Sequence, residues 1–160
     1  MNAPSDIRLR RARFRDAPAI ALLLREAFAE YQPLYTPAGY EATVIANQQV
    51  LTRIKEGPVW IALLDESIVG TVSVVPRNKS LYIRGMAVSP SARGRRIGGM
   101  LLTQVEKFAM GQGSRRLFLS TTPFLDRAIR LYETFGFCKT DEGPHELFGT
   151  PLFTMEKVMT

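Results

Sequence analysis

The chain has 160 residues, of which 46% are hydrophobic and 22% are charged, so it is large enough to bury a core as one globular domain. A single cysteine and a single histidine exclude an intramolecular disulfide and a Cys/His zinc cluster. The first 15 residues contain several arginines and no apolar stretch, and no uncharged run approaches the roughly 20 residues of a membrane helix. We therefore expect one domain over residues 1–160, located in the cytoplasm, with no membrane contact and no metal.

The net charge of +6 is concentrated in one part of the chain. Between Glu66 and Glu106 there is no acidic residue, and the basic ones are Arg77, Lys79, Arg84, Arg93, Arg95 and Arg96. The rest of the chain has 15 basic and 15 acidic residues. Such a segment is typical of a site for a polyanionic ligand, although a solvated basic surface would look the same. We expect no nucleic acid as partner, because the charges crowd into one turn with no aromatic platform between them.

The first third of the chain is predicted to form a strand and two helices. Residues 7–11 alternate apolar and basic side chains, which indicates a strand. Asp16 and Pro18 are suited to start a helix, whose apolar side chains recur at helical spacing at Ile20, Leu23, Leu24, Ala27, Phe28 and Tyr31. Residues 32–39 contain two prolines and a glycine and are expected to form a loop, and residues 41–55 a second helix.

The rest of the chain is predicted to supply most of a sheet. Strands are expected at residues 59–64, 68–75 and 81–88, and their short connections predict antiparallel neighbours. A helix to about Met110 is stopped by two glycines. The remaining elements expected are a strand at 116–120, a helix at 122–135 and strands at 136–139 and 147–158. This order predicts the α/β class, with a central mixed sheet of six or seven strands and helices on both faces.

Residues 86–99 carry the clearest chemical pattern. They read Met-Ala-Val-Ser-Pro-Ser-Ala-Arg-Gly-Arg-Arg-Ile-Gly-Gly, so a strand ends, a loop rich in Arg and Gly turns, and a helix begins. The first N–H groups of a helix are unpaired and lie at the positive end of its dipole. Glycine lets a ligand approach the backbone, and arginine suits forked phosphate contacts. The pattern predicts a pyrophosphate site, but it is neither a Walker loop nor a dinucleotide fingerprint.

This segment resembles the acyl-CoA-binding motif of the GNAT superfamily of N-acetyltransferases, R/Q-x-x-G-x-G/A after a strand. Arg93 and Gly98 match, whereas Arg96 stands where the family usually has glycine; a side chain fits there if the backbone angles are already helical. Residues 128–137, Ala-Ile-Arg-Leu-Tyr-Glu-Thr-Phe-Gly-Phe, match the family pattern A-x-x-L-Y-x-x-x-G-F. Asp126 falls where many members have an asparagine that contacts the cofactor.

The resemblance implies a GNAT fold and an acetyltransferase with acetyl-CoA as co-substrate. The acceptor would be a primary amine of a small molecule or peptide, attacking directly in a ternary complex, and a homodimer is a further expectation. Residues implied to bind the cofactor are Met86, Ala87 and Val88 along the pantetheine arm, Arg93, Gly94, Arg95, Arg96, Ile97, Gly98 and Gly99 around the pyrophosphate, and Asp126. Tyr132 would be the general acid that protonates the leaving thiolate.

Several alternatives stay open on the sequence alone. Tyr132 also completes an apolar helical stripe, so it could simply pack in the core. The strand at 81–86 has no carboxylate where many members place a glutamate base. A water or a residue from elsewhere would then take the amine proton, or the chain would be a sensor that binds acyl-CoA without turning it over. Residues that could instead line an acceptor pocket or attract a cationic acceptor are Tyr31, Tyr35, Tyr40, Glu26 and Glu30.

Overall fold

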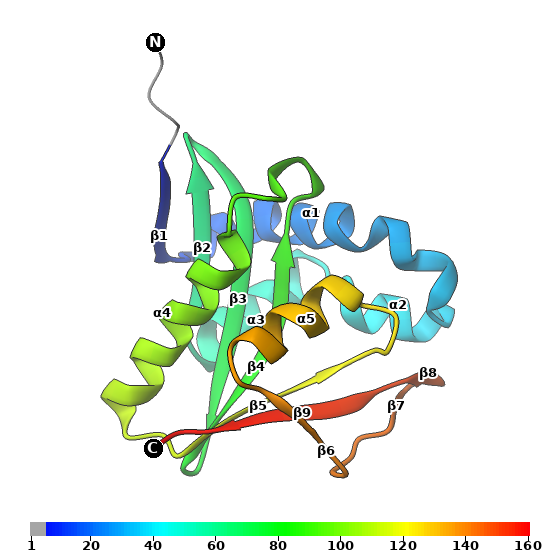
Figure 1. Cartoon of the computed structure of the whole chain (residues 1–160). Helices are drawn as coiled ribbons and strands as arrows, with labels where there is room; N and C mark the ends of the chain where they lie inside the picture. The colour runs from blue at the N-terminus through cyan, green and yellow to red at the C-terminus, as the bar shows by residue number, and fades with distance from the viewer. Residues whose placement is uncertain (1–5) are drawn as a thin grey trace.

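The computed structural model of the chain describes residues 6–160, and residues 1–5 of the predicted domain lie outside them. A seven-stranded sheet in the order β1-β2-β3-β4-β5-β9-β6 forms its centre, with helices on both faces (Figure 1). The strands are Ile7–Arg11 (β1), Val59–Leu64 (β2), Ser67–Arg77 (β3), Ser80–Val88 (β4), Arg116–Thr121 (β5), Cys138–Thr140 (β6), Glu146–Leu147 (β7), Thr150–Pro151 (β8) and Phe153–Val158 (β9). The predicted fold class is confirmed.

Five α-helices and three short 3-10 turns complete the described chain. The α-helices are Ala17–Phe28 (α1), Pro37–Thr43 (α2), Asn47–Glu56 (α3), Ile97–Gln112 (α4) and Asp126–Thr134 (α5). The 3-10 turns are Phe14–Asp16 (η1), Ala29–Leu34 (η2) and Pro90–Ala92 (η3). Strands β2 to β4 are antiparallel neighbours as predicted, and β1 adds to β2, also antiparallel. Strands β4 and β5 are parallel, and β9 lies antiparallel between β5 and β6.

The helix predicted over residues 41–55 is wrong in its extent, because two helices occupy this region. Thr36 accepts a hydrogen bond from the Gly39 N–H at 3.0 Å, so α2 already begins inside the predicted loop. The backbone leaves the helical region at Val44 (φ −98°, ψ 78°). A new helix then starts where the Gln49 side chain accepts from the Ala46 N–H at 2.8 Å. Side-chain hydrogen bonds at the helix ends therefore divide into α2 and α3 the region that was predicted as one helix.

The boundaries of three other elements also differ from the prediction. The strand predicted over 147–158 is a short hairpin of β7 and β8 followed by β9, because Phe148 and Gly149 turn with positive φ. The helix predicted from Thr122 begins only at Asp126. Asp16 does precede α1, but its carboxylate binds Arg10 and a backbone N–H of the preceding turn instead of capping the helix.

Two apolar clusters hold the helices against opposite faces of the sheet. On one face, α4 and α5 pack on side chains such as Trp60 and Val72. On the other, α1 and α3 pack on side chains such as Ile61 and Val59. Neighbouring residues of a strand point to opposite faces, and the nearly unbroken burial of β2 reflects its cover on both sides (Figure 1).

Strands β4 and β5 pair only at their beginnings and then separate. The parallel ladder joins Ser80–Tyr82 to Arg116–Phe118 and goes no further. Beyond it, Gly85 adopts a positive φ of 65° where the register against β3 shifts, which is a β-bulge. The bulge turns β4 away from β5, so the edge of β4 that faces β5 lacks a strand partner over its second half. This opening in the middle of the sheet positions the candidate site.

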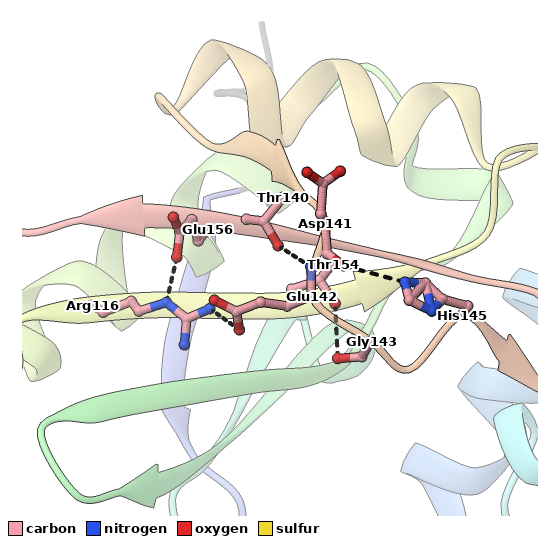
Figure 2. Close-up of polar contacts among 8 residues, drawn as sticks. All are labelled: Arg116, Thr140, Asp141, Glu142, Gly143, His145, Thr154 and Glu156. Carbon is pink, nitrogen blue, oxygen red and sulfur yellow. Dashed lines mark hydrogen bonds and ion pairs between the residues drawn. The ribbon is translucent and has the colours of Figure 1, made fainter.

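The loop between β6 and β9 is tied to the sheet by polar contacts (Figure 2). The Arg116 guanidinium on β5 donates to Glu156 on β9 and, at 2.8 Å, to Glu142 in the loop. The Thr154 hydroxyl donates to the Gly143 carbonyl at 3.4 Å. Each of these contacts is partly exposed and contributes little alone, but together they hold the start of the segment that contains the β7–β8 hairpin.

The β7–β8 hairpin in turn contacts the start of α2 through Thr36, the N-cap residue of that helix. The Thr36 hydroxyl donates to the Phe148 carbonyl at 2.8 Å, and the Thr36 N–H donates to the Thr150 hydroxyl at 2.9 Å. Residues more than a hundred positions apart in the chain are therefore held together. The neighbouring residues Tyr35 and Leu147 line the pocket described below.

Helix α4 begins at a residue with a strained backbone. Arg96, its N-cap, has left-handed angles of φ 62° and ψ 25°. We expected helical angles here if a side chain replaced the family's glycine, and the structure differs. A left-handed residue with a Cβ costs roughly 1–2 kcal/mol.

Replacing Arg96 by glycine should relieve this strain. We expect Arg96→Gly to be more stable than Arg96→Ala by about 0.5–1 kcal/mol, because the strain relieved is partly offset by the conformational entropy that glycine loses. Both variants remove the guanidinium, so charge is matched. Urea denaturation of the two variants measures the difference. Equal free energies of unfolding would contradict the left-handed backbone at this position.

Candidate active site

A pocket of about 670 Å³ occupies the opening between β4 and β5. The second half of β4, the end of β5, the first turn of α4 and one face of α5 form its walls, and η2 and α3 contribute from the other face of the sheet. Most of the residues singled out from the sequence line it: Met86, Ala87, Val88, Arg93, Gly94, Arg96, Ile97, Gly98, Gly99 and Tyr132. The two sequence motifs therefore meet in one cavity.

The β4 wall presents a free backbone edge to this pocket. Ala87 and Val88 pair with Thr71 and Gly70 of β3 on one side, whereas the β5 ladder ends at Tyr82. Met86 and Val88 pack toward the α4 and α5 side and Ala87 toward the α1 and α3 side. An extended ligand could hydrogen-bond to this edge as an additional strand would.

The loop before α4 forms the second wall. A Cβ added at Gly94, which has φ +84°, would meet no atom within 4 Å, so this residue borders open space. A Cβ at Gly98 would lie 2.7 Å from a methyl carbon of Leu131. Gly98 is thus required for the close approach of α4 and α5, and a substitution there would disturb packing as well as any ligand. The unpaired N–H groups of the first turn of α4 lie in the same wall.

Glu30 connects the loop before α4 with two other elements. Its carboxylate forms an ion pair with Arg93 and accepts from Arg127 of α5 at 2.9 Å. Arg127 also donates to the Tyr31 hydroxyl at 2.7 Å. Glu30 is therefore engaged by two guanidinium groups, and this disfavours the interpretation that it attracts a cationic acceptor.

The position of Tyr132 is compatible with both a packing role and the predicted catalytic role. Its side chain is only 6% exposed and its ring lies 5.9 Å from that of Phe137, so it belongs to the core. It also lines the pocket. Burial raises the pKa of the Tyr132 phenol well above its usual range. The phenol consequently keeps its proton at neutral pH and can act as a donor toward the cavity.

Aromatic side chains line the part of the pocket next to η2. Tyr31 and Tyr35 line it, and Tyr35 packs edge-on against Phe124 with 4.9 Å between ring centroids. Tyr40 packs against Tyr35 at 5.8 Å but does not line the cavity. One of the three tyrosines considered from the sequence is thus a packing residue.

Sequence reasoning missed several lining residues. Arg53 lines the pocket, as do Thr121 and Thr122 at the end of β5, whose buried hydroxyls have no hydrogen-bond partner in the described structure. Arg84 also lines it, but it had been noted from the sequence only as part of the basic segment. Thr121 and Thr122 lie at the carboxyl end of β5, a strand of the parallel pair, and ligands often bind at such strand ends. This position was the sequence signal that could have identified them. Arg53 gave none, because its role depends on how α3 packs.

Two predicted cofactor residues lie away from the cavity. Arg95 and Asp126 are exposed and do not line it, so their contacts stay predictions. Within residues 6–160, no three His, Cys, Asp or Glu side chains are grouped to hold a metal ion. In that same part of the chain, every helix is too short or too polar to cross a membrane.

Comparisons with known proteins agree with this geometry. The Acetyltransferase (GNAT) family matches residues 20–137. An uncharacterised N-acetyltransferase of Escherichia coli, YjgM, is 31% identical over 142 residues, which cover 84% of each chain. Human N-acetyltransferase 8B is 34% identical over 89 residues, but these cover only 39% of its length and 52% of this chain.

Solved structures show the same fold at lower identity. The PaiA N-acetyltransferase of Thermoplasma acidophilum, in complex with coenzyme A, has a TM-score of 0.83 at 19% identity and covers 96% of this chain and 99% of its own. YncA of Salmonella typhimurium, with its cofactor acetyl-CoA, has a TM-score of 0.75 at 21% identity, over 96% and 94% of the two chains. With the family match and the E. coli relative, we conclude that this chain belongs to the GNAT family of acetyl-CoA-dependent N-acetyltransferases.

Proposed function

We propose that this protein transfers an acetyl group from acetyl-CoA to a primary amine of a small molecule or peptide by direct attack in a ternary complex. The observation that carries the proposal is that Tyr132 lines the same pocket as the loop of residues 86–99. One cavity thus offers a free strand edge, a phosphate-binding turn and a proton donor. Homodimerisation and a cytoplasmic location stay predictions.

Two walls of the pocket suit the two parts of acetyl-CoA. The pantetheine arm contains amide groups, which can pair with the backbone edge of Met86–Val88. The pyrophosphate can lie at the first turn of α4, where Gly94 borders open space and Arg93 and Arg96 bring positive charge. The related fold in complex with coenzyme A supports the assignment of this cavity to the cofactor.

The chemical step exchanges one bond for another at the thioester carbon. The neutral amine attacks this carbon, a C–N bond forms, and the tetrahedral intermediate collapses as the C–S bond breaks. The sulfur leaves with its electron pair and receives the proton of the Tyr132 phenol. The attacking nitrogen loses its own proton, and a proton returned through water restores the Tyr132 phenol. The products are an N-acetyl compound and coenzyme A. A positioned general acid contributes about 10²–10⁴-fold to such a step.

No carboxylate in the pocket lining is available to accept the proton of the amine, since no Asp or Glu of the described part of the chain lines the pocket. We propose that water takes this proton. Backbone carbonyls of the β4 edge, which has no strand partner beyond Tyr82 on the β5 side, lie in the cavity wall and can hold such a water.

A sensor that binds acyl-CoA without turnover is the second candidate function. The lack of a lining carboxylate favours it. The position of Tyr132 argues against it, because a purely binding cavity does not need a phenol there. Kinetics of a Tyr132 variant separate the two.

Acetyl-CoA should stabilise the protein by mass action, by about 2.7 kcal/mol at a hundred times its Kd. Dephospho-CoA should bind more weakly if an arginine contacts the 3′-phosphate.

We expect Arg93→Ala to weaken acetyl-CoA binding at least tenfold, about 1.4 kcal/mol. Arg130→Ala, which removes an exposed arginine outside the pocket, should leave affinity unchanged. Thermal shift and calorimetric titration measure both effects. The absence of a shift at millimolar acetyl-CoA would refute the cofactor site.

Tyr132→Phe removes only the hydroxyl and keeps the ring that packs on Phe137. We expect kcat to fall by roughly 10²-fold or more while the Kd of acetyl-CoA changes little. Tyr40→Phe is the matched control, since Tyr40 lies outside the cavity lining, and it should keep wild-type kcat. Release of free coenzyme A with an accepted amine gives the rates.

Two outcomes would count against this assignment. Full turnover in Tyr132→Phe would leave Tyr132 with a packing role only. Tight acetyl-CoA binding by the wild type without turnover of a broad set of amines would instead support the sensor.

A further inference from the structure

The charges that line the pocket are all of one sign. Among residues 6–160, five arginines line it, and no aspartate or glutamate does; the arginines are Arg53, Arg84, Arg93, Arg96 and Arg127. A cavity of this kind raises the local concentration of anions and repels cations. It therefore disfavours polyamines and lysine-rich peptides as acceptors.

Three of these arginines have evident partners. Arg93 and Arg96 belong to the loop that suits the phosphates of acetyl-CoA. Arg127 is held by Glu30 and the Tyr31 hydroxyl. Arg53 and Arg84 lie elsewhere, at the start of the opening between β4 and β5, and the cofactor assignment does not account for them.

Arg53 and Arg84 meet on the α1 and α3 side of the sheet. Ile83 packs in the core under α4 and α5, so the next residue, Arg84, points to the opposite side, where it pairs with Glu56 of α3 at 2.6 Å. Arg53, also on α3, reaches the β-bulge. A Cβ added at Gly85 would lie only 2.6 Å from its Nη1 atom. The bulge glycine thus leaves space for the Arg53 guanidinium against the β4 backbone.

The charges of this pair are not balanced by the protein. Glu56 is one carboxylate for two guanidinium groups, and within residues 6–160 no carboxylate oxygen lies within 4 Å of the Arg53 nitrogens. The Nε of Arg84 is buried without a hydrogen-bond partner. Burial and then the charge of Arg84 lower the pKa of Arg53 to about 10. An uncompensated cation of this kind costs stability, and such groups cluster at binding sites.

We propose that Arg53 and Arg84 bind a carboxylate of the acceptor, which makes the acceptor an amino acid or a close derivative with a free amine. The three charges at the site sum to one positive charge, which a singly charged carboxylate neutralises better than a phosphate does. Guanidinium groups bind carboxylates through paired hydrogen bonds. Gly85 directly precedes Met86 on β4, and one strand residue spans about 3.3 Å. A carboxylate here therefore leaves the amine of a small molecule near the strand edge that would hold the pantetheine.

The inference rests on the proposed function, and paired acceptors test it. We would measure kcat/KM for L-methionine, L-phenylalanine, L-threonine and L-aspartate, each against its α-carboxamide. The carboxamides have the less basic amine, so they present more of the reactive neutral form. We nevertheless expect the wild type to prefer the carboxylates at least tenfold. Preference for the carboxamides would overturn the proposal.

Variants of α3 locate the preference. Arg53→Met should bring the carboxylate to carboxamide ratio near one by raising the KM of the amino acid, with the Kd of acetyl-CoA unchanged. Lys55→Met removes the same charge from an exposed position of the same helix and should keep the wild-type ratio. Arg53→Lys keeps the charge but loses the planar fork, so it should retain a reduced preference. An unchanged ratio in Arg53→Met would overturn the proposal.

A binding measurement separates this inference from the proposed function. We would titrate the protein, saturated with coenzyme A, with N-acetyl-L-methionine and with its carboxamide. We expect the carboxylate to bind at least tenfold more tightly in the wild type and in Lys55→Met, and this difference to vanish in Arg53→Met. That result would stand even if the protein transferred no acetyl group. Equal affinities for the two compounds would contradict the anion site while leaving N-acetyl transfer to other amines intact.

Discussion

The separation of β4 from β5 is the feature on which the rest of the site depends. The two strands share a parallel ladder only from Ser80 to Tyr82, and the bulge at Gly85 then turns β4 away. Unpaired backbone groups are costly when buried, so the second half of β4 is kept beside an open pocket of about 670 Å³. The opening also connects the two faces of the sheet. A cofactor on the side of α4 and α5 can therefore meet an acceptor on the side of α1 and α3.

The charges follow the same division. At one end, the loop before α4 combines helix N–H groups with Arg93 and Arg96, which suits phosphates. At the other, Arg53 and Arg84 exceed the charge of Glu56 by one. Glu30 lies near the first end and is engaged by Arg93 and Arg127. Positive charge at both ends of the cavity favours the two anionic reactants proposed above, and a protonated phenol is among the lining side chains.

The sequence was sufficient for the parts of this arrangement that are local. The strand–loop–helix of residues 86–99 was predicted in place, because its pattern depends on neighbouring residues. The helix with Tyr132 was also predicted, although it begins at Asp126 and not at Thr122. Contacts between residues far apart in the chain could not be predicted from the sequence. The ion pair of Arg93 and Glu30 joins positions 63 apart, and the approach of Arg53 to Gly85 depends on how α3 packs on the sheet. The left-handed backbone angles of Arg96 also differed from the expectation, because an arginine in the sequence does not indicate a left-handed backbone.

Hydrogen–deuterium exchange on addition of acetyl-CoA tests the central claim most directly, because it reports where backbone groups become protected. If the free edge of β4 binds the pantetheine arm and the start of α4 binds the phosphates, protection should rise over residues 86–99. The edge strand β1, which β2 and β3 separate from β4, should exchange at the same rate with and without acetyl-CoA. Protection confined to other segments, with residues 86–99 unchanged at saturating acetyl-CoA, would contradict the account.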